Sequence, residues 1–411
     1  MKVLDMEPRA MPETSFIPFY APSLGEEEIR EVEATLRSGW LTSGPRAAQF
    51  EQEFGAYVGA AHALAVSSGT AGLHLALAGL GIGPGDEVVT SPLTFCSTVH
   101  TILQTGAVPV LADIGPDGNI DPDAIGKRIT ESTRAIIPVH FAGLPCKMRA
   151  IRALARRHGI YVIEDAAHAA GAHYEGRPIG AAPAADGPDV SDAVVFSFCA
   201  TNGEGGMVTT YREPLAKKLR TLSLHGLSKE SWNSSNEWGD WCREVVAAGF
   251  KYNLSDILAA IGIHQLRKLE QFIEIRTRYA QIYNQALGDL DEVELPPDNP
   301  RSRHAWDLYV LRLNLAKLKI DRRAFLQELR RRQIGASVHF IPIPLHPYFA
   351  QLHLARCRCP RALELYPRLV SLPLYPAMTE DQVHYVAQSV REALQAGRRQ
   401  AFAMGGAQPL S

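Results

Sequence analysis

Short apolar runs alternate with longer amphipathic segments between residues 63 and 210. The runs are rich in Val, Ile and Ala and are bounded by turn-forming residues, which is the pattern of buried β-strands. Most of the intervening segments have the length and apolar spacing of helices, as in Met148–His158. Strands that alternate with helices predict an α/β fold with a mostly parallel sheet and helices on both faces. About seven strands are expected, at 63–66, 87–91, 108–114, 135–140, 160–165, 193–198 and 207–210.

One connection in this sheet is too short for a parallel crossover. Only eight residues, 199–206, separate the run that ends at Phe198 from the run that begins at Met207. A parallel crossover needs about a dozen residues or more. One strand of the sheet is therefore expected to be antiparallel.

The flanking regions predict irregular ends and a second, smaller unit. Residues 1–24 contain four prolines and predict an arm, whereas residues 401–411 predict a tail. A large domain is predicted at 25–265, and a bridging helix with a small C-terminal α/β domain at 266–400. Helices are expected at 25–39, 47–58, from Ser255 onward, and at 265–287, 321–332 and 379–396, and strands at 306–313 and 336–343.

Composition and charge exclude several classes of function. Hydrophobic residues at 46% and charged residues at 21% describe a globular protein with a sizeable core. The formal net charge of -2 gives no reason to expect a nucleic acid partner. No apolar stretch is long enough to span a membrane, and Met1–Phe16 has no signal-peptide core. The six cysteines lack metal-site spacing, so we expect no bound metal and a reducing, cytoplasmic compartment.

Two carboxylates end the apolar run at 160–165. A strand that ends in Glu164 and Asp165 puts charge at the carboxyl edge of the sheet, where α/β proteins bind ligands. A partly desolvated carboxylate suits a cationic ring nitrogen, such as the pyridinium of pyridoxal phosphate (PLP). On the residues alone, a second interpretation is equally open, in which Asp165 merely caps a following helix.

Three further features point to the same edge, each with a structural alternative. Ser67-Ser68-Gly69-Thr70-Ala71 follows a strand and opens a helix, which suits a phosphate but also describes any tight turn. Phe95 lies just past a strand and could stack on a flat ring or belong to the core. His168, three residues after Asp165, could bond a ring oxygen or be structural.

Taken together, the motifs resemble the DegT/StrS-type sugar aminotransferases over about residues 16 to 395. The resemblance implies a fold-type I PLP enzyme that aminates keto sugars, usually nucleotide-linked, with glutamate as the common amino-acid donor. The matching segments are SGWLTSGP, AVSSGTAGLHLAL, SPLTFCST, AIIPVHFAG, VIEDAAHAAGA, FSF, GEGGMVTT, GFKYNLSDILAAIG, HAWDLYVLR, VHFIPIPLHPY and SLPLYPAMTEDQV.

The resemblance assigns a role to individual residues of the cofactor site. Asp165 would pair with the pyridine nitrogen, Phe95 would stack on the ring, and His168 would lie at its oxygen edge. The PLP phosphate would be held by Thr70, Ala71 and Ser197.

The resemblance also implies a homodimer with shared active sites and a small-molecule substrate. Asn253 would reach the phosphate in the neighbouring subunit, and His339 would lie on the sugar side. The polar loop 228–244 carries three tryptophans, and we expect Trp238 to flank the substrate mouth, unless these rings anchor the loop to the core.

One motif departs from the family pattern. After FSF the family has a loop of the form ATKNxTTGEGG, whose lysine forms the Schiff base with PLP. Here residues 199–206 read CATNGEGG, about four residues shorter and without the lysine. Two alternatives to an active aminotransferase therefore stay open. One is a non-catalytic PLP-binding partner or sensor, and the other is a PLP-dependent sugar dehydratase, for which Thr201 and Asn202 are poor bases.

Overall fold

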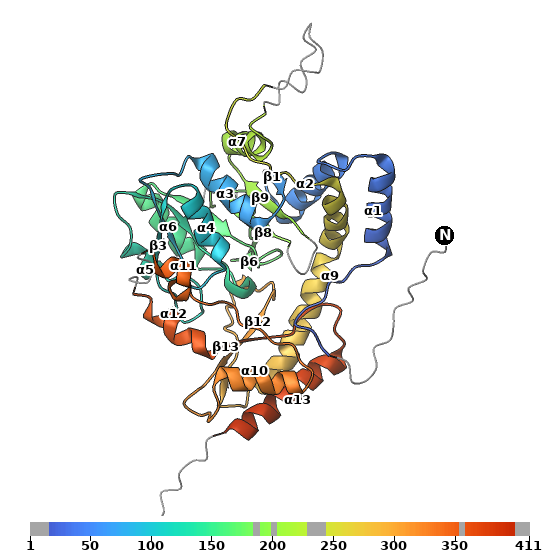
Figure 1. Ribbon diagram of the computed structural model, residues 1–411, viewed down its shortest axis with the longest axis vertical. Coiled ribbons are helices and arrows are strands. Elements are labelled where there is room, and N and C mark those ends of the chain that lie inside the picture. Colours follow the sequence, from blue (N-terminus) through green and yellow to red (C-terminus); the bar gives the residue numbers. More distant parts are fainter. Residues whose placement is uncertain (1–15, 184–189, 199–203, 228–243, 353–357, 399–411) are drawn as a thin grey trace, which may run out of the picture.

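The computed structural model describes residues 16–183, 190–198, 204–227, 244–352 and 358–398 (Figure 1). Its largest element is a seven-stranded sheet with the order β1-β9-β8-β5-β4-β2-β3. Neighbouring strands are parallel except at β9, which runs antiparallel to both β1 and β8. The predicted strand number and the predicted antiparallel strand are thus confirmed. The strands are β1 (His62–Val66), β2 (Glu87–Thr90), β3 (Val108–Leu111), β4 (Thr133–Ile137), β5 (Tyr161–Asp165), β8 (Ala193–Ser197) and β9 (Gly206–Thr210).

Helices cover both faces of this sheet, as the alternating segments predicted. Successive side chains of a strand point to opposite faces, so Ile163 packs with α3, α4 and α7, whereas Val162 packs with α5 and α6. Helices α2 and α9 complete the second face through Phe50, Phe54 and Ile263. The helices around this sheet, on its two faces together, are α1 (Glu26–Ser38), α2 (Pro45–Val58), α3 (Gly69–Leu80), α4 (Cys96–Gln104), α5 (Pro122–Gly126), α6 (Met148–His158), α7 (Glu213–Ser223) and α9 (Asp256–Leu287).

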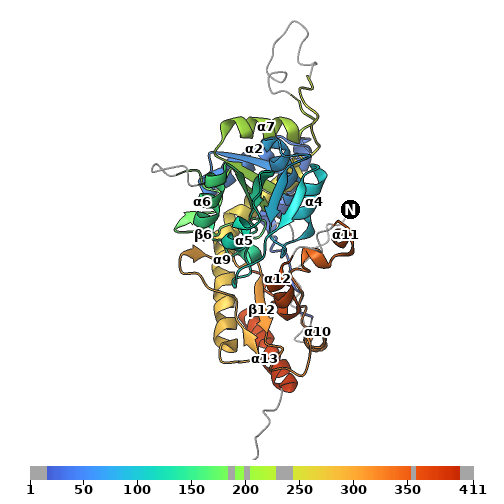
Figure 2. The ribbon, with the colours of Figure 1, turned by 90° about the vertical axis from the view of Figure 1, so that its left-hand side faces the viewer.

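Helix α9 joins the large sheet to a second core (Figure 2). The sequence predicted two helices here, but the structure has one of 32 residues, preceded by the N-cap Ser255. In the first half of α9, Ile263 packs with α2, and His264 and Gln265 form hydrogen bonds with α1. In its second half, Tyr279 and Tyr283 lie in the core beneath the small sheet.

The small sheet has the order β10-β12-β13 and is antiparallel. The predicted strand at 336–343 is wrong, because only Ser337 forms a bridge there, to Ser371. Pro342 and Pro344 cannot donate to a ladder, and the buried run at 369–372 takes the place instead. The elements are β10 (Val293–Glu294), β12 (Tyr309–Leu313), β13 (Leu369–Leu372), α10 (Arg322–Arg331), α11 (Pro347–Ala350), α12 (Pro360–Leu365) and α13 (Glu380–Gly397). Short pieces are β6 (His173–Tyr174), β7 (Arg177–Pro178), β11 (Ser302–Arg303), η1 (Phe141–Gly143), η2 (Ile343–Leu345) and η4 (Tyr366–Arg368).

A buried carboxylate fixes the start of α9 against the start of α2. Asp256 is fully buried and accepts backbone N–H bonds from Gly44, Arg46 and Ala47 at 2.6–3.0 Å. These amides open α2, whose first-turn N–H groups have no partner within the helix. Asp256 is the first residue of its own helix, α9, and also caps a second helix, α2. The predicted domain boundaries remain a prediction.

Candidate active site

Asp165 lies at the carboxyl end of β5 and is only 4% exposed. Its Oδ2 accepts a hydrogen bond from Thr98 Oγ1 of α4 at 2.8 Å, and its Oδ1 accepts one from the Ala167 N–H at 3.2 Å. No helix follows Asp165, since residues 166–169 form a turn closed by Ala169 N–H and the Ala166 carbonyl. The helix-cap interpretation is therefore wrong.

The electrostatics of Asp165 favour a cationic ligand. Burial raises the pKa of Asp165, and the bonds from Thr98 and Ala167 and the charge of His168 only partly oppose this effect. Within the described ranges, no lysine or arginine pairs with its carboxylate. A buried carboxylate without a cation is unfavourable unless a ligand supplies the charge.

Glu164, the preceding residue, points to the opposite face of the sheet. Its carboxylate pairs with Arg152 Nη2 and His140 Nε2, both at 2.8 Å. Because the Cys146 N–H donates to His140 Nδ1, the proton of this imidazole lies on Nε2 and is donated to Glu164. Burial acts to raise the pKa of Glu164, but Arg152 and His140 outweigh it and lower the pKa to about 2. Both oxygens of the Glu164 carboxylate thus have partners within the chain.

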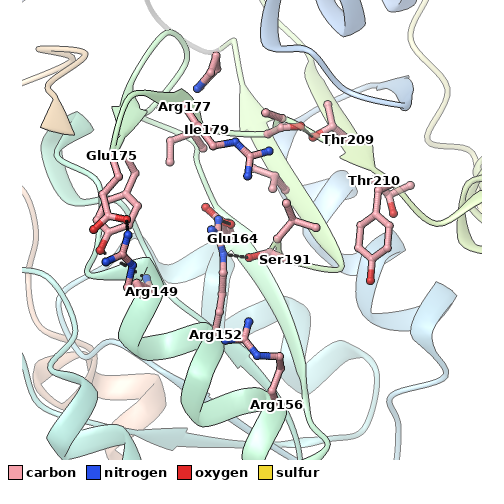
Figure 3. Close-up of a pocket in the computed structure, with 17 residues that line it drawn as sticks. Arg149, Arg152, Arg156, Glu164, Glu175, Arg177, Ile179, Ser191, Thr209 and Thr210 are labelled. Atoms are coloured by element: carbon pink, nitrogen blue, oxygen red, sulfur yellow. Dashed lines mark hydrogen bonds and ion pairs between the residues drawn. The ribbon is translucent and has the colours of Figure 1, made fainter. Parts of the chain in front are cut away.

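A cavity of about 570 Å³ opens on this second face, with Glu164, Arg152 and Ser191 at its base (Figure 3). Arg149 at its side pairs with Glu175 at 2.5 Å, and Arg177 donates to the Ala182 carbonyl. Each of these cations has a partner in the chain. The strand alternation therefore separates the arginine-lined cavity from Asp165, which faces α4.

The start of α3 and the end of β8 meet at the same edge as Asp165. Ser68 caps α3 and its hydroxyl accepts the Ala71 N–H at 3.0 Å. A Cβ placed on Gly69 would lie 2.8 Å from the Cβ of Ser197, so only glycine allows this approach. The structure thus brings the predicted residues Thr70, Ala71 and Ser197 together at a helix N-terminus, where backbone amides favour an anion.

Aromatic rings lie beside this edge. Phe95 is 57% exposed, so the core interpretation of this residue is wrong. Its ring centroid lies 5.9 Å from that of Phe340, which in turn stacks on His168 at 5.6 Å and 18°. Phe340 belongs to the VHFIPI motif but was not singled out as a site residue.

Two histidines occupy the rim of the site. His168 Nε2 lies 3.8 Å from Asp307 Oδ2. His339 Nδ1 bonds with Ser371 Oγ at 2.9 Å, and its ring stacks on Phe19 and meets Phe340 edge-on. Burial and the charge of His168 lower the pKa of His339 to about 4. His339 is therefore neutral near pH 7.

Asn253 lies next to the end of β1 in its own chain, where it bridges Val66. Its amide nitrogen donates to Ser43 Oγ at 2.7 Å, and its oxygen accepts from the Lys251 ammonium. Trp238 and the shortened part of the loop at 199–203 lie outside the described residues.

The described part of the chain offers no metal site and no membrane span. No group of three or more His, Cys, Asp or Glu side chains in it could hold a metal ion. Nor does any helix there have the length and apolar character that crossing a bilayer requires.

A family model for the DegT/DnrJ/EryC1/StrS aminotransferase family matches residues 22–391. The chain belongs to this family. Its relative SpsC of Bacillus subtilis (strain 168), a spore coat polysaccharide biosynthesis protein, is 47% identical over 384 residues, which is 92% of this chain and 97% of SpsC.

Solved structures of aminotransferases agree with the fold. The putative sugar aminotransferase Spr1654 of Streptococcus pneumoniae in its PLP form has a TM-score of 0.85 and 29% identity, covering 93% of this chain and 99% of Spr1654. Spr1654 is also solved with pyridoxamine phosphate (PMP). Helicobacter pylori PseC, an aminotransferase of pseudoaminic acid biosynthesis, has a TM-score of 0.84 and 28% identity, covering 93% and 100%. The predicted fold-type I architecture and the PLP cofactor are thus confirmed at the level of the family.

Proposed function

We propose that this chain is a sugar aminotransferase whose acceptor is a nucleotide-linked keto sugar and whose donor is glutamate. The acceptor and the donor rest on the family resemblance, and one observation of the structure supports the cofactor that this reaction needs. Asp165 is a buried carboxylate at the carboxyl end of a central strand, and no lysine or arginine in the described ranges pairs with it. A pyridinium nitrogen supplies that charge.

The residues present fit the cofactor at its ring nitrogen, ring face, phosphate and oxygen edge. Asp165, fixed by Thr98, would hold the ring nitrogen, and exposed Phe95 would cover one ring face. Thr70, Ala71 and Ser197 would hold the phosphate at the start of α3, and His168 would lie at the oxygen edge of the ring. When bound, the cofactor would supply an electron sink for the carbanion formed during amino transfer and a carrier for the amino group between donor and keto sugar.

The Schiff-base lysine of the family's site is missing from its expected place in the sequence. Without a lysine in residues 199–206, the chain has no group there to bind the cofactor covalently or to move protons during amino transfer. A positioned proton-transfer group contributes about a hundredfold to ten-thousandfold in rate. We therefore expect non-covalent cofactor binding, at most one slow half-reaction starting from PMP, and no sustained turnover.

Two other functions compete with an impaired aminotransferase. The missing lysine favours a non-catalytic PLP-binding partner or sensor, which would bind the cofactor and a sugar without turnover. A sugar dehydratase would need a base in the loop, which Thr201 and Asn202 supply poorly.

We further propose a cytoplasmic homodimer with sites shared between subunits, in which Asn253 acts across the interface. Mixing Asn253→Ala and Ser197→Ala variants should regenerate one intact cofactor site per heterodimer. Sedimentation of the native chain as a monomer would refute the shared site.

Equilibrium dialysis of the native chain against PLP and PMP tests the proposed function. Saturable binding of either compound, at one site per chain, is the expected result. If neither compound binds, the proposed aminotransferase is refuted, and so are the two alternatives, because all three need the cofactor. The product of a single turnover of the PMP-loaded chain with a nucleotide-linked keto sugar then distinguishes amination, dehydration and no reaction.

A further inference from the structure

The carboxylate of Asp307 lies beside the imidazole of His168, at the edge of the site. Asp307 Oδ2 and His168 Nε2 are 3.8 Å apart, and both side chains are about one fifth exposed, at 24% and 20%. The family resemblance gives His168 a place next to the cofactor ring and gives Asp307 no role. We propose that Asp307 is a positioning residue that fixes the ring orientation and tautomer of His168. This role rests on the proposed cofactor binding.

The backbone holds Asp307 in this place. The Ala305 N–H donates to the Gly143 carbonyl at 3.0 Å, and the Leu308 N–H donates to the Ala142 carbonyl at 3.2 Å. A Cβ on Gly143 would lie 2.8 Å from the His168 carbonyl oxygen and 3.2 Å from the Asp307 nitrogen. Gly143, at φ 96°, therefore lets the two segments approach each other.

The imidazole is constrained on a face and on an edge. Phe340 stacks on its face at 5.6 Å, while Asp307 lies at Nε2. At 3.8 Å the pair is a long ion-pair contact, and a side-chain movement of about 0.7 Å, which two partly exposed side chains can make without ligand, would turn it into a hydrogen bond. With Nε2–H directed at the carboxylate, Nδ1 becomes the nitrogen left for the cofactor.

The other charged neighbours of this pair are identifiable. His168 is also close enough to Asp165 and His339 to act on the pKa of each, and in both cases its charge lowers the pKa. Behind Asp307 lies Arg276 of α9, which is buried and whose Nε has no hydrogen-bond partner among the described residues. Burial lowers the pKa of Arg276 and the charge of Asp307 opposes this. A purely structural role for Asp307 would thus be to neutralise Arg276.

Nitrogen-detected histidine spectra of the cofactor-free protein separate the two roles. His168 is identified by the signal lost in His168→Phe. We expect the Nε2–H form in the native chain and in Asp307→Asn, whose side-chain oxygen still accepts. Asp307→Leu should give a mixture of tautomers. The control Asp291→Leu, which removes an exposed ion pair with Lys317, should leave the Nε2–H form of His168 unchanged. An unchanged tautomer in Asp307→Leu would overturn the proposal.

A double-mutant cycle on PMP affinity provides a second test. Asp307→Leu should weaken binding about three- to tenfold in the native background and less than about twofold in His168→Phe. An equal loss in both backgrounds would overturn the role. Asp307→Leu leaves Arg276 without its neighbouring charge. If this variant does not fold, the double variant Asp307→Leu/Arg276→Met, which removes both charges, is used in place of Asp307→Leu in both tests. If the native chain binds neither PLP nor PMP, the proposed function fails, while the tautomer measurement still decides the role of Asp307.

Discussion

Replacing Asp165 by Asn removes the negative charge that would pair with the ring nitrogen of the cofactor, and it leaves the shape of the site unchanged. The amide oxygen of Asn can still accept from Thr98, which donates to Asp165 at 2.8 Å. What is lost is the pairing of a 4% exposed carboxylate with a pyridinium. Removing one partner of a buried ion pair costs about 3–5 kcal/mol. Since about 1.4 kcal/mol is tenfold in affinity, the dissociation constant for PLP should rise about a hundredfold or more.

The stability of the cofactor-free protein should not decrease in Asp165→Asn, although its PLP affinity does. Burial raises the pKa of Asp165 in the folded state. A carboxyl group with a raised pKa contributes stability below its unfolded pKa, and that contribution is lost as the pH rises through the folded pKa. Above the folded pKa, the ionised Asp165 therefore weakens the free protein. The Tm of cofactor-free Asp165→Asn should be equal to or higher than that of the native chain.

Glu164→Gln is the matched control, at the adjacent residue and equally buried. Because it breaks the pair with Arg152 and His140 on the other face, it should lower the free energy of unfolding by about 3 kcal/mol. PLP affinity of the folded fraction should change little. Urea unfolding and fluorescence titration with PLP measure both quantities. Equal PLP affinity in Asp165→Asn and the native chain would refute the assigned role of Asp165.

Three further changes follow from the described contacts and the sequence. Asp256→Ala removes the acceptor of three backbone N–H groups and should lower the free energy of unfolding by about 2–3 kcal/mol in urea, without changing PLP affinity of the folded fraction; an unchanged free energy would show that the cap is dispensable. His339 has its pKa lowered to about 4, so its contribution to stability is present above the unfolded value and is lost as the pH falls from about 6.5 toward 4. Unfolding at pH 7 and pH 5 should therefore differ less in His339→Gln than in the native chain, and an equal difference would contradict this. Trp238→Ala should weaken sugar-nucleotide affinity more than it lowers Tm, whereas the reverse would identify Trp238 as an anchor.

The sheet was predictable because its strands are buried on both faces and read as apolar runs. The short link after Phe198 predicted one antiparallel strand, and the structure shows that this strand is β9. The small domain was less predictable. The run at 336–343 looks like a strand by residue type, but its prolines and its place at the site rim leave only one bridge, at Ser337. Which of two similar apolar runs pairs with β12 depends on tertiary contacts.

The site was predictable where a residue's position along a strand defines its direction. Asp165 and Glu164 are alike in composition, and alternation alone puts one toward α4 and the other toward Arg152. Thr98, Phe340 and Asp307 were missed as individual residues. Thr98 lies one helical turn after Phe95, which was the available signal. Asp307 carries no such signal, because its approach to His168 arises from the packing of a distant segment on Gly143.

The most direct test of the account is borohydride reduction of the PLP-loaded chain, followed by peptide mass spectrometry and a glutamate turnover assay. Because residues 199–206 contain no lysine, we expect bound PLP that is released unmodified and no repeated turnover. Insertion of the family's lysine-bearing residues between Thr201 and Gly203 should create both a reduced pyridoxyl adduct on the new lysine and turnover. A pyridoxyl adduct on any lysine of the native chain, with multiple turnovers from glutamate, would contradict the account.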